Sequence, residues 1–359
     1  MTLVSRVVLS AQSTNNTHMK NTLIPPPAPA FFLGIDVGKI DLFCHIIGPI
    51  NLVSQRFDNT HSGIKQLIKW LFGIADPQLF CACLEQTGHY GRPLAKALVQ
   101  QKLSAVYLVN PRQIKAYGEQ KLRRNKSDTA DARLIAQFLK SEHSELLPWQ
   151  PLSPENEKIK ELSRYADSIT QDTARLKTKC EAVTLPAILR SLNRRIKAQE
   201  KELTDIRKRI NTLIANNTAL STQYELLESI PGLGEITCQT LLAELPEIES
   251  FGDARQLAAW AGLTPRHFVS GTSGRSQTPI TKVGSTHLRK ALFMPAMNAR
   301  VFNPLLKTFG DRLKENGKKP KQIIIAIMRK LLHQIYGILK SGEPFDPNKI
   351  GYITATQPQ

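Results

Sequence analysis

The chain has 359 residues, enough for two or three domains that each bury a core. Lysine and arginine number 48 against 30 acidic residues, and the resulting net charge of +18 favours nucleic acid or an anionic membrane surface as partner. No apolar run approaches the roughly 20 residues that span a bilayer, so nucleic acid is favoured and no membrane is expected. The five cysteines form no Cys-x-x-Cys pair, which argues against a disulfide framework or zinc site and for a reducing cytoplasm.

Residues 1–30 are expected to be a disordered tail, because a polar and proline-rich sequence cannot build a core. Met1 and Met19 are equally good candidates for the start of translation, and the sequence does not decide between them. The next segment, residues 31–148, alternates short apolar runs with amphipathic stretches. Strands are predicted at residues 31–37, 42–47, 52–57, 79–85 and 105–109, with helices around 64–71, at 93–101 and from 128. Three strands, helix, strand, helix, strand, helix is the order of the ribonuclease H-like α/β fold.

Acidic residues mark the ends of two of these strands and the start of the last helix. Asp36 closes the first strand and Glu85 the fourth, while Asp128 and Asp131 are three apart and share a helix face. Taken alone, the helix start also fits a capped surface helix with Ser127 as N-cap. In this strand order, however, all four carboxylates are predicted to meet at one edge of the sheet.

Clustered carboxylates repel one another and stay ionised only when cations neutralise them. Hard oxygen ligands favour Mg²⁺ or Mn²⁺, and two such ions about 3.5–4 Å apart can activate a phosphodiester. The segment Gly34–Gly38 also resembles the first phosphate loop of the actin-like sugar kinases. That family needs a second glycine-rich loop and an adenosine motif, and neither is found.

Residues 149–222 are predicted to form a helical coiled-coil arm. Its apolar stripe alternates three- and four-residue steps, interrupted once by Gln199, and Pro186 divides it into two long helices. The stripe consists of Leu189, Leu192, Ile196, Leu203, Ile206, Ile210 and Leu213. It fits an intramolecular hairpin and a dimerising arm equally well.

The mainly helical third domain is predicted over residues 223–342, followed by a tail at 343–359. Ser229–Thr237 indicates a helix–hairpin–helix-like element whose turn amides can meet phosphate, although an ordinary tight turn between helices also fits. Residues 261–275 then predict a basic, glycine-flanked loop with serines, and a basic helix follows from Thr286. Local chemistry alone does not make a serine there a nucleophile.

Seven motifs in this order resemble one family over about residues 31–340. The DEDD-type transposases of bacterial insertion sequences, which include the pilin-gene invertase, show the same succession. The motifs are Gly34–Val37, Leu84–Gly88, Val109–Pro111, Lys126–Ala132, Ile230–Gly234, Ala261–Arg266 with Ser270-Gly271, and Lys282–Gly284.

The resemblance implies a RuvC-like catalytic domain whose acidic tetrad is Asp36, Glu85, Asp128 and Asp131. It further implies a serine nucleophile that forms a phosphoserine link with DNA. Ser270 is the matching residue, and Ser273, which also precedes a glycine, is the competitor.

The resemblance also implies double-stranded DNA and a structured guide RNA as partners, and dimers that assemble into tetramers. A cytoplasmic, nucleoid-associated bacterial protein is expected. Nucleic-acid contacts are assigned to Arg123, Arg124, Lys126, Arg266, Arg275, Lys282 and Arg289. Two other readings remain: a structure-specific nuclease that uses only the tetrad, and an inactive nucleic-acid-binding relic.

Overall fold

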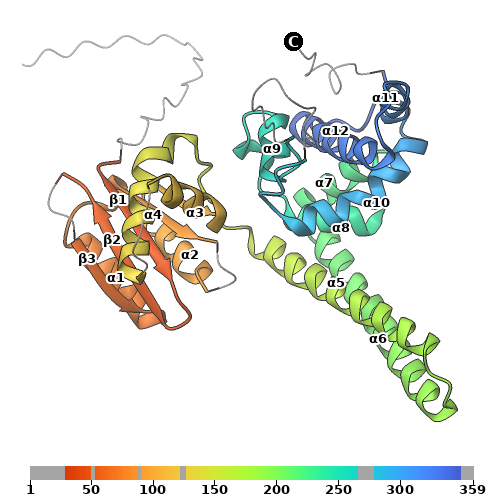
Figure 1. The fold of residues 1–359 in the computed structure, drawn as a ribbon, viewed down its shortest axis with the longest axis horizontal. Helices are drawn as coiled ribbons and strands as arrows, with labels where there is room; N and C mark the ends of the chain where they lie inside the picture. The colour runs from red at the N-terminus through yellow and green to blue at the C-terminus, as the bar shows by residue number, and fades with distance from the viewer. Residues whose placement is uncertain (1–28, 50–52, 87–89, 122–126, 266–278, 349–359) are drawn as a thin grey trace, which may run out of the picture.

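The computed structural model describes residues 29–49, 53–86, 90–121, 127–265 and 279–348. Three parts follow one another along the chain (Figure 1): a sheet unit, a hairpin of two long helices and a helical unit. The fold is therefore α/β in the first part and α-helical in the remainder.

The sheet unit contains one five-stranded mixed sheet of order β3-β2-β1-β4-β5. β1 pairs antiparallel with β2 and parallel with β4; β2 pairs antiparallel with β3, and β4 parallel with β5. The strands are β1 Phe31–Val37, β2 Asp41–Ile47, β3 Val53–Asp58, β4 Phe80–Glu85 and β5 Ala105–Val109. All five predicted strands are present, with ends that shift by no more than one residue.

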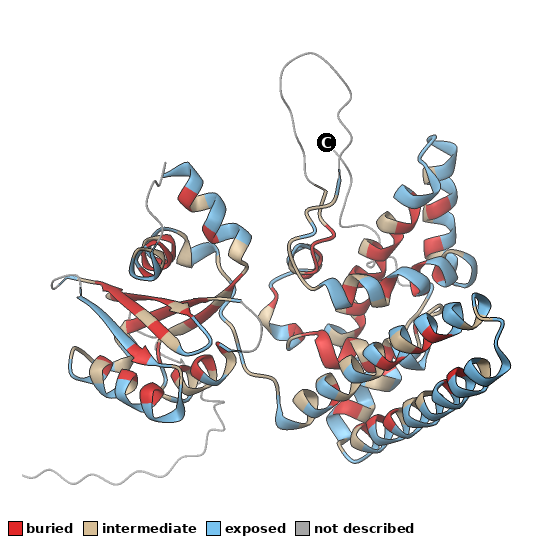
Figure 2. Ribbon diagram, turned by 60° about the horizontal axis from the view of Figure 1, so that its bottom comes forward, coloured by how far each residue is buried: buried red, intermediate tan, exposed pale blue. Residues whose placement is uncertain are grey.

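Helices cover both faces of this sheet, which explains why β1 and β4 are apolar except for one acidic residue near the end of each. The helices are α1 His61–Phe72, α2 Arg92–Gln100, α3 Pro111–Gln120 and α4 Asp128–Glu142. One core joins the odd-numbered residues of β1 to α1 and α2, and the other joins Phe32, Cys81 and Cys83 to α3 and α4. Figure 2 shows the buried residues along the strands and on the inner sides of the helices.

The hairpin consists of α5 (Pro154–Glu181) and α6 (Pro186–Ala215), which lie side by side. The predicted break falls before Pro186. From the apolar stripe, Leu192 and Ile196 pack with Leu176 of α5, and the predicted interruption Gln199 accepts a hydrogen bond from Thr173 at 2.9 Å. The stripe therefore serves the intramolecular hairpin, and no described contact tests a dimerising role.

The helical unit has one apolar core, to which the adjoining parts of α5 and α6 contribute Ile159, Ile169, Ile206 and Ile210. Its helices are α7 Thr218–Glu228, α8 Glu235–Glu244, α9 Ala254–Trp260, α10 Thr286–Phe302, α11 Pro304–Glu315 and α12 Pro320–Ser341. α7 and α8 flank the glycine turn as predicted. Gly232 in that turn (φ +103°) lies so close to α10 that a Cβ would be 2.7 Å from the Ala299 backbone. This side of the turn is therefore occupied by packing.

Within the described residues, α12 alone is long and apolar enough for a membrane span. Most of its apolar window is buried in the helical unit, with eleven buried residues that include Lys330, His333 and Gln334. α12 is thus a core helix, and no membrane is indicated.

Candidate metal centre

Asp36 and Glu85 lie on the same face of the sheet because strand residues alternate between faces. Phe32 precedes Asp36 by four residues, and Cys83 precedes Glu85 by two; both belong to the core on the α4 side. β1 and β4 run parallel, and their register extends to the pair Ile35 and Leu84. The two acids are the next residues on neighbouring strands, so both reach the same edge under α4.

The N-terminus of α4 supplies the other two carboxylates. Ser127 is the N-cap, as predicted, and its Oγ accepts a hydrogen bond from Ala130 N at 3.3 Å. Asp128 and Asp131 occupy the first turn, where acidic side chains are favoured by the helix dipole. Capping and site formation therefore use the same sequence, and the two interpretations of this segment do not exclude each other.

Gly34 determines how closely α4 approaches β1. A Cβ at this position would lie 2.3 Å from both the Ala132 oxygen and the Ala136 nitrogen, which are backbone atoms of α4. Only glycine permits this contact, two residues before Asp36 on the same face. This packing role of Gly34 was not predicted, although a glycine inside a buried strand often marks a close backbone approach.

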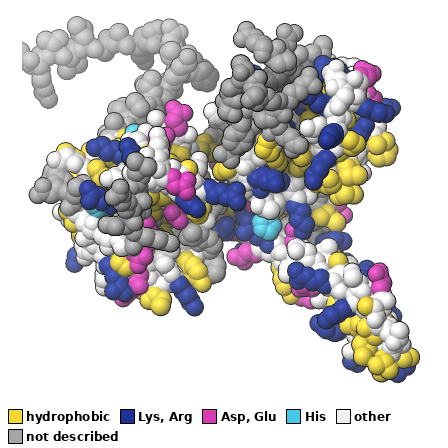
Figure 3. Space-filling model, viewed as in Figure 1, with side chains coloured by type: hydrophobic (Ala, Val, Ile, Leu, Met, Phe, Trp, Pro, Cys, Tyr) yellow, Lys and Arg dark blue, Asp and Glu magenta, His cyan; other side chains and the backbone are white. Residues whose placement is uncertain are grey.

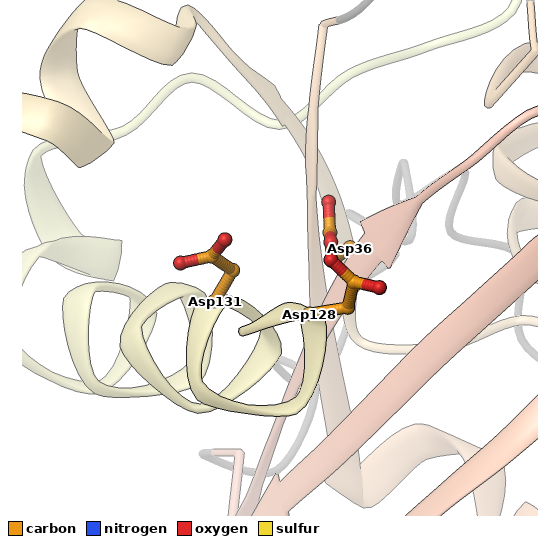
Figure 4. Close-up of side chains that lie close together, drawn as sticks. All are labelled: Asp36, Asp128 and Asp131. Carbon is orange, nitrogen blue, oxygen red and sulfur yellow. The ribbon is translucent and has the colours of Figure 1, made fainter. Parts of the chain in front are cut away.

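Three of the four predicted carboxylates form one cluster (Figure 4). One oxygen from each of Asp36, Asp128 and Asp131 lies within 4.8 Å of the others. Asp36 and Asp131 are half-buried, while Asp128 is exposed. Glu85 is electrostatically coupled to this cluster, because burial and then the charges of Asp36 and Asp131 raise its pKa above the ordinary value. The structure thus brings all four predicted acids into one neighbourhood.

The donor set fits a divalent cation. All four side chains offer hard carboxylate oxygens, the ligands that Mg²⁺ and Mn²⁺ prefer. Opposite ligands of one Mg²⁺ ion lie about 4 Å apart, given bonds of 2.0–2.1 Å, and the aspartate oxygens lie within 4.8 Å of one another. A small adjustment of side chains that are partly solvent-exposed brings them into range. The arrangement therefore suits divalent-metal chemistry, whichever of these ions is used.

Several predicted site residues lie outside the described residues. They are Arg123, Arg124, Lys126, Arg266, Ser270 and its competitor Ser273, and Arg275. Their assigned roles stay predictions.

The two ends of the serine-bearing segment 266–278 are held together. Pro265 and Ile280 form an isolated antiparallel bridge, and Thr281 N donates to Thr264 O at 2.9 Å. Lys282 N donates to Gly262 O at 3.2 Å, and Lys282 itself is exposed with a φ of +55°. The described residues on either side of 266–278 therefore form a short two-stranded base.

Arg289 of α10 secures this base. Its Nη1 donates to Ala261 O at 3.0 Å, and its Nη2 to Thr286 Oγ1 at 3.2 Å. Burial lowers the pKa of Arg289, and the charge of Arg112 on α3 lowers it further. The base thus lies within electrostatic reach of the sheet unit. Arg289 was predicted to contact nucleic acid, and its contact with the Ala261 backbone was not predicted, because the local sequence does not signal it.

The match to known proteins covers both the sheet unit and the helical unit. Residues 33–189 match the IS110 DEDD transposase family, and residues 224–311 match a family described as transposase IS116/IS110/IS902. The pilin gene-inverting proteins of Moraxella bovis and Moraxella lacunata are each 32% identical over 320 residues, or 88% of this chain and 97% of theirs.

This chain belongs to the IS110 family of transposases. The IS110 family protein is therefore a DNA transposase or recombinase, as its sequence motifs predicted. A 43.6 kDa protein of the insertion element IS110 from Streptomyces coelicolor is 29% identical over 159 residues, 44% of this chain and 38% of that one. Among solved structures, T. thermophilus RuvC in complex with a Holliday junction substrate matches 32% of this chain and 96% of its own, at 12% identity and a TM-score of 0.26.

Proposed function

We propose that this IS110 family protein moves an insertion sequence by metal-dependent cleavage and rejoining of DNA through a covalent serine intermediate. The observation that carries the proposal is the convergence of Asp36, Asp128 and Asp131 within 4.8 Å, with Glu85 coupled to them. Carboxylates gathered from two strand ends and one helix start are a costly arrangement without a cation. Their position at one edge of the sheet leaves Asp128 open to a substrate.

The sheet unit is proposed to be ribonuclease H-like. Support comes from its strand order, with three antiparallel strands followed by two parallel ones, and from a helix across β1 that carries the last two acids. In this assignment the fold serves to place acids from distant sequence positions under one helix N-terminus.

In the proposed mechanism the tetrad holds the cations and orients the scissile phosphate. Bound Mg²⁺ or Mn²⁺ supplies neutralisation of the developing charge. Asp36 and Glu85 lie on strands, and Asp128 and Asp131 lie on a capped helix, so the backbone positions of the four acids are held before DNA binds.

Ser270 is proposed as the nucleophile. Its Oγ forms a bond to phosphorus while the bond to a deoxyribose oxygen breaks; the serine proton passes to water and the leaving oxygen takes up a proton. Attack by another deoxyribose hydroxyl reverses these steps and rejoins the strand without a high-energy cofactor. Arg266 and Arg275 are proposed to clamp the phosphate. The base formed by the residues on either side of 266–278 supports this role, because it holds Pro265 and Ile280 side by side.

The proposed partners are double-stranded DNA, a structured guide RNA and further copies of the chain. Lys and Arg side chains are spread over the sheet unit, the hairpin and the helical unit (Figure 3), consistent with the net charge of +18. The guide RNA and the dimers and tetramers rest on the family resemblance, with the long hairpin as the proposed dimer arm. The proposed location is the cytoplasm, in association with the nucleoid. All five cysteines are free, which is consistent with a reducing compartment.

The test is recombination on a plasmid that carries the gene with its native flanking DNA, with junction products amplified. We expect junctions from the wild type and from Ser273→Ala, and none from Ser270→Ala or Asp128→Asn. Junctions from Ser270→Ala would overturn the assigned covalent step and favour Ser273 or direct metal-assisted chemistry, as in a structure-specific nuclease. A plasmid that lacks the noncoding flank tests the guide RNA, because its loss should abolish junctions made by the wild-type protein.

A further inference from the structure

Five basic side chains gather in the helical unit, where α12 meets α9 and α11. They lie apart from the candidate metal centre, which is in the sheet unit (Figure 1). Arg329, Lys330 and His333 lie on α12, Arg255 on α9 and Arg312 on α11. We call these residues the α12 basic cluster. On α12 the spacing is i, i+1 and i+4, so the three side chains project from adjoining parts of one helix surface.

Arg329 and His333 carry buried nitrogen atoms for which no described residue is a partner. His333 is 4% exposed, and Arg329 is half-buried. Among the described residues, no hydrogen-bond partner is found for Arg329 Nε or for either ring nitrogen of His333. Buried nitrogen atoms are normally satisfied, so three in one cluster require an explanation such as an absent ligand.

The cluster also concentrates positive charge. Burial and the charges of Arg329, Arg312 and Arg255 lower the pKa of Lys330, and burial and Arg255 lower that of Arg329. The charges of Lys330, Arg329 and Arg255 lower the pKa of His333. Among the described groups that shift this pKa, Asp253 is the one carboxylate. Asp253 already accepts a hydrogen bond from Gln256 N at the start of α9.

Phe309 of α11 offsets some of this repulsion. Arg312 lies 5.6 Å from the centre of its ring and Lys330 lies 5.8 Å from it, so one ring makes cation–π contacts with two side chains. Repulsion among clustered cations in a partly buried site lowers the stability of the free protein. Retaining them is understandable if the protein binds an anion there.

We propose that the α12 basic cluster binds a phosphate of the nucleic-acid backbone. Arg255 and Arg312 are exposed, so the site opens to solvent, and Arg329 is half-buried. Arginine side chains bind phosphate through paired N–H donors, which suits a backbone contact that carries no sequence information. The proposal shares with the proposed function only its nucleic-acid partner, and requires no cleavage chemistry.

The experiment measures how binding of an unrelated DNA duplex by the full-length protein depends on salt. It is done in a chelator so that strand cleavage does not contribute. Arg255→Met and Arg329→Met each remove a charge and keep the aliphatic stem, and Lys318→Met, at an exposed lysine before α12, is the matched control. Loss of one phosphate contact reduces the slope of log K against log salt by about 0.9. We expect this loss, with affinity about 3- to 10-fold weaker, for the two arginine variants relative to the control.

Thermal unfolding without nucleic acid separates ligand binding from a structural role. Arg329→Met should melt at or above the wild-type temperature, because it relieves repulsion in the free protein. A lowered melting temperature with unchanged DNA affinity would show a structural cluster and overturn the proposal. So would salt slopes of both arginine variants equal to that of the control.

Inorganic phosphate is the second probe. If the site takes backbone phosphate, micromolar duplex should raise the wild-type melting temperature while phosphate at the same concentration leaves it unchanged. Equal stabilisation by inorganic phosphate would overturn the backbone assignment and make free phosphate the ligand. Recombination is not measured in either assay, so failure here leaves the plasmid test of the proposed function unaffected.

Discussion

Gly34 has no side chain, and this allows α4 of the candidate metal centre to pack directly against β1. Replacing it with alanine places a methyl group 2.3 Å from two α4 backbone atoms, so α4 must move away from β1. Overpacking of this kind typically costs about 1–3 kcal/mol. We expect Gly34→Ala to lower the unfolding midpoint in urea and to lose Mn²⁺ binding as the three aspartate oxygens separate.

Gly73→Ala is the control for this prediction. Gly73 ends α1 with a φ of −71°, and its nearest neighbour would lie at an ordinary 3.4 Å from the new methyl group. Mn²⁺ affinity should match the wild type in this variant. Wild-type Mn²⁺ affinity in Gly34→Ala would show that the close approach does not position the carboxylates.

His333 gives a second prediction at this scale, a pH dependence of stability. Burial and neighbouring cations lower its pKa from 6.5 to about 4, so the folded protein prefers the neutral ring. A group with a lowered folded pKa that charges on protonation contributes stability above the unfolded value, and this contribution is lost as pH falls from 6.5 to about 4. The full loss is at most about 3.4 kcal/mol, at 1.36 kcal/mol for each pH unit.

His333→Leu should therefore lose less stability than the wild type between pH 6.5 and 4, measured by urea unfolding at each pH. His61→Gln, at an exposed position in the first turn of α1, should follow the wild-type curve. Parallel curves for His333→Leu and the wild type would contradict the prediction.

Among elements, α5 is tied to α8 by a charged contact that fixes the hairpin to the helical unit. Glu244 of α8 has a 4% exposed side chain and accepts from Arg164 Nε at 2.7 Å, and Lys160 Nζ lies 3.3 Å away. Removing one partner of a buried ion pair costs about 3–5 kcal/mol, because the remaining charges are uncompensated. We expect a loss near the lower end for Glu244→Gln in urea unfolding, since Arg164 is 38% exposed.

Glu200→Gln is the matched control, because its partner Lys177 joins α5 to α6 at the surface. Their side chains are 49% and 59% exposed, and exposed pairs are worth about 0–1 kcal/mol. Equal losses in the two glutamine variants would show that burial of Glu244 does not govern its contribution.

The elements were largely predictable because their signals are local. β1 and β5 have the predicted bounds, since runs such as Phe31–Val37 are apolar except for Asp36 and are followed by a polar or glycine residue. Ser127 and Pro186 mark helix starts through capping and through the missing N–H of proline, both properties of the residue itself. The convergence of the four acids also followed from strand order.

What could not be predicted depends on contacts between distant residues. Gly34 against Ala136, Arg289 on Ala261 O and two cations on Phe309 each join separate elements, and one sequence carries no record of such pairs. For the same reason, the heptad stripe did not show which helix packs against it. Periodicity shows that a face is apolar, and only the fold shows that α5 covers it.

For the whole molecule, the net charge is +18, while the part of the chain that the structure describes holds one acidic cluster, so nucleic-acid binding and metal binding can be separated. Chelation should abolish strand cleavage and leave duplex affinity within about two-fold, because the positive charges that bind DNA are those of lysines and arginines.

Adding Mg²⁺ at 100 times its dissociation constant should stabilise the free wild-type protein by about 2.7 kcal/mol. Asp128→Asn should show a smaller shift while binding duplex normally. A Mg²⁺ shift as large in Asp128→Asn as in the wild type would place the metal elsewhere and remove the basis for the proposed chemistry at this centre.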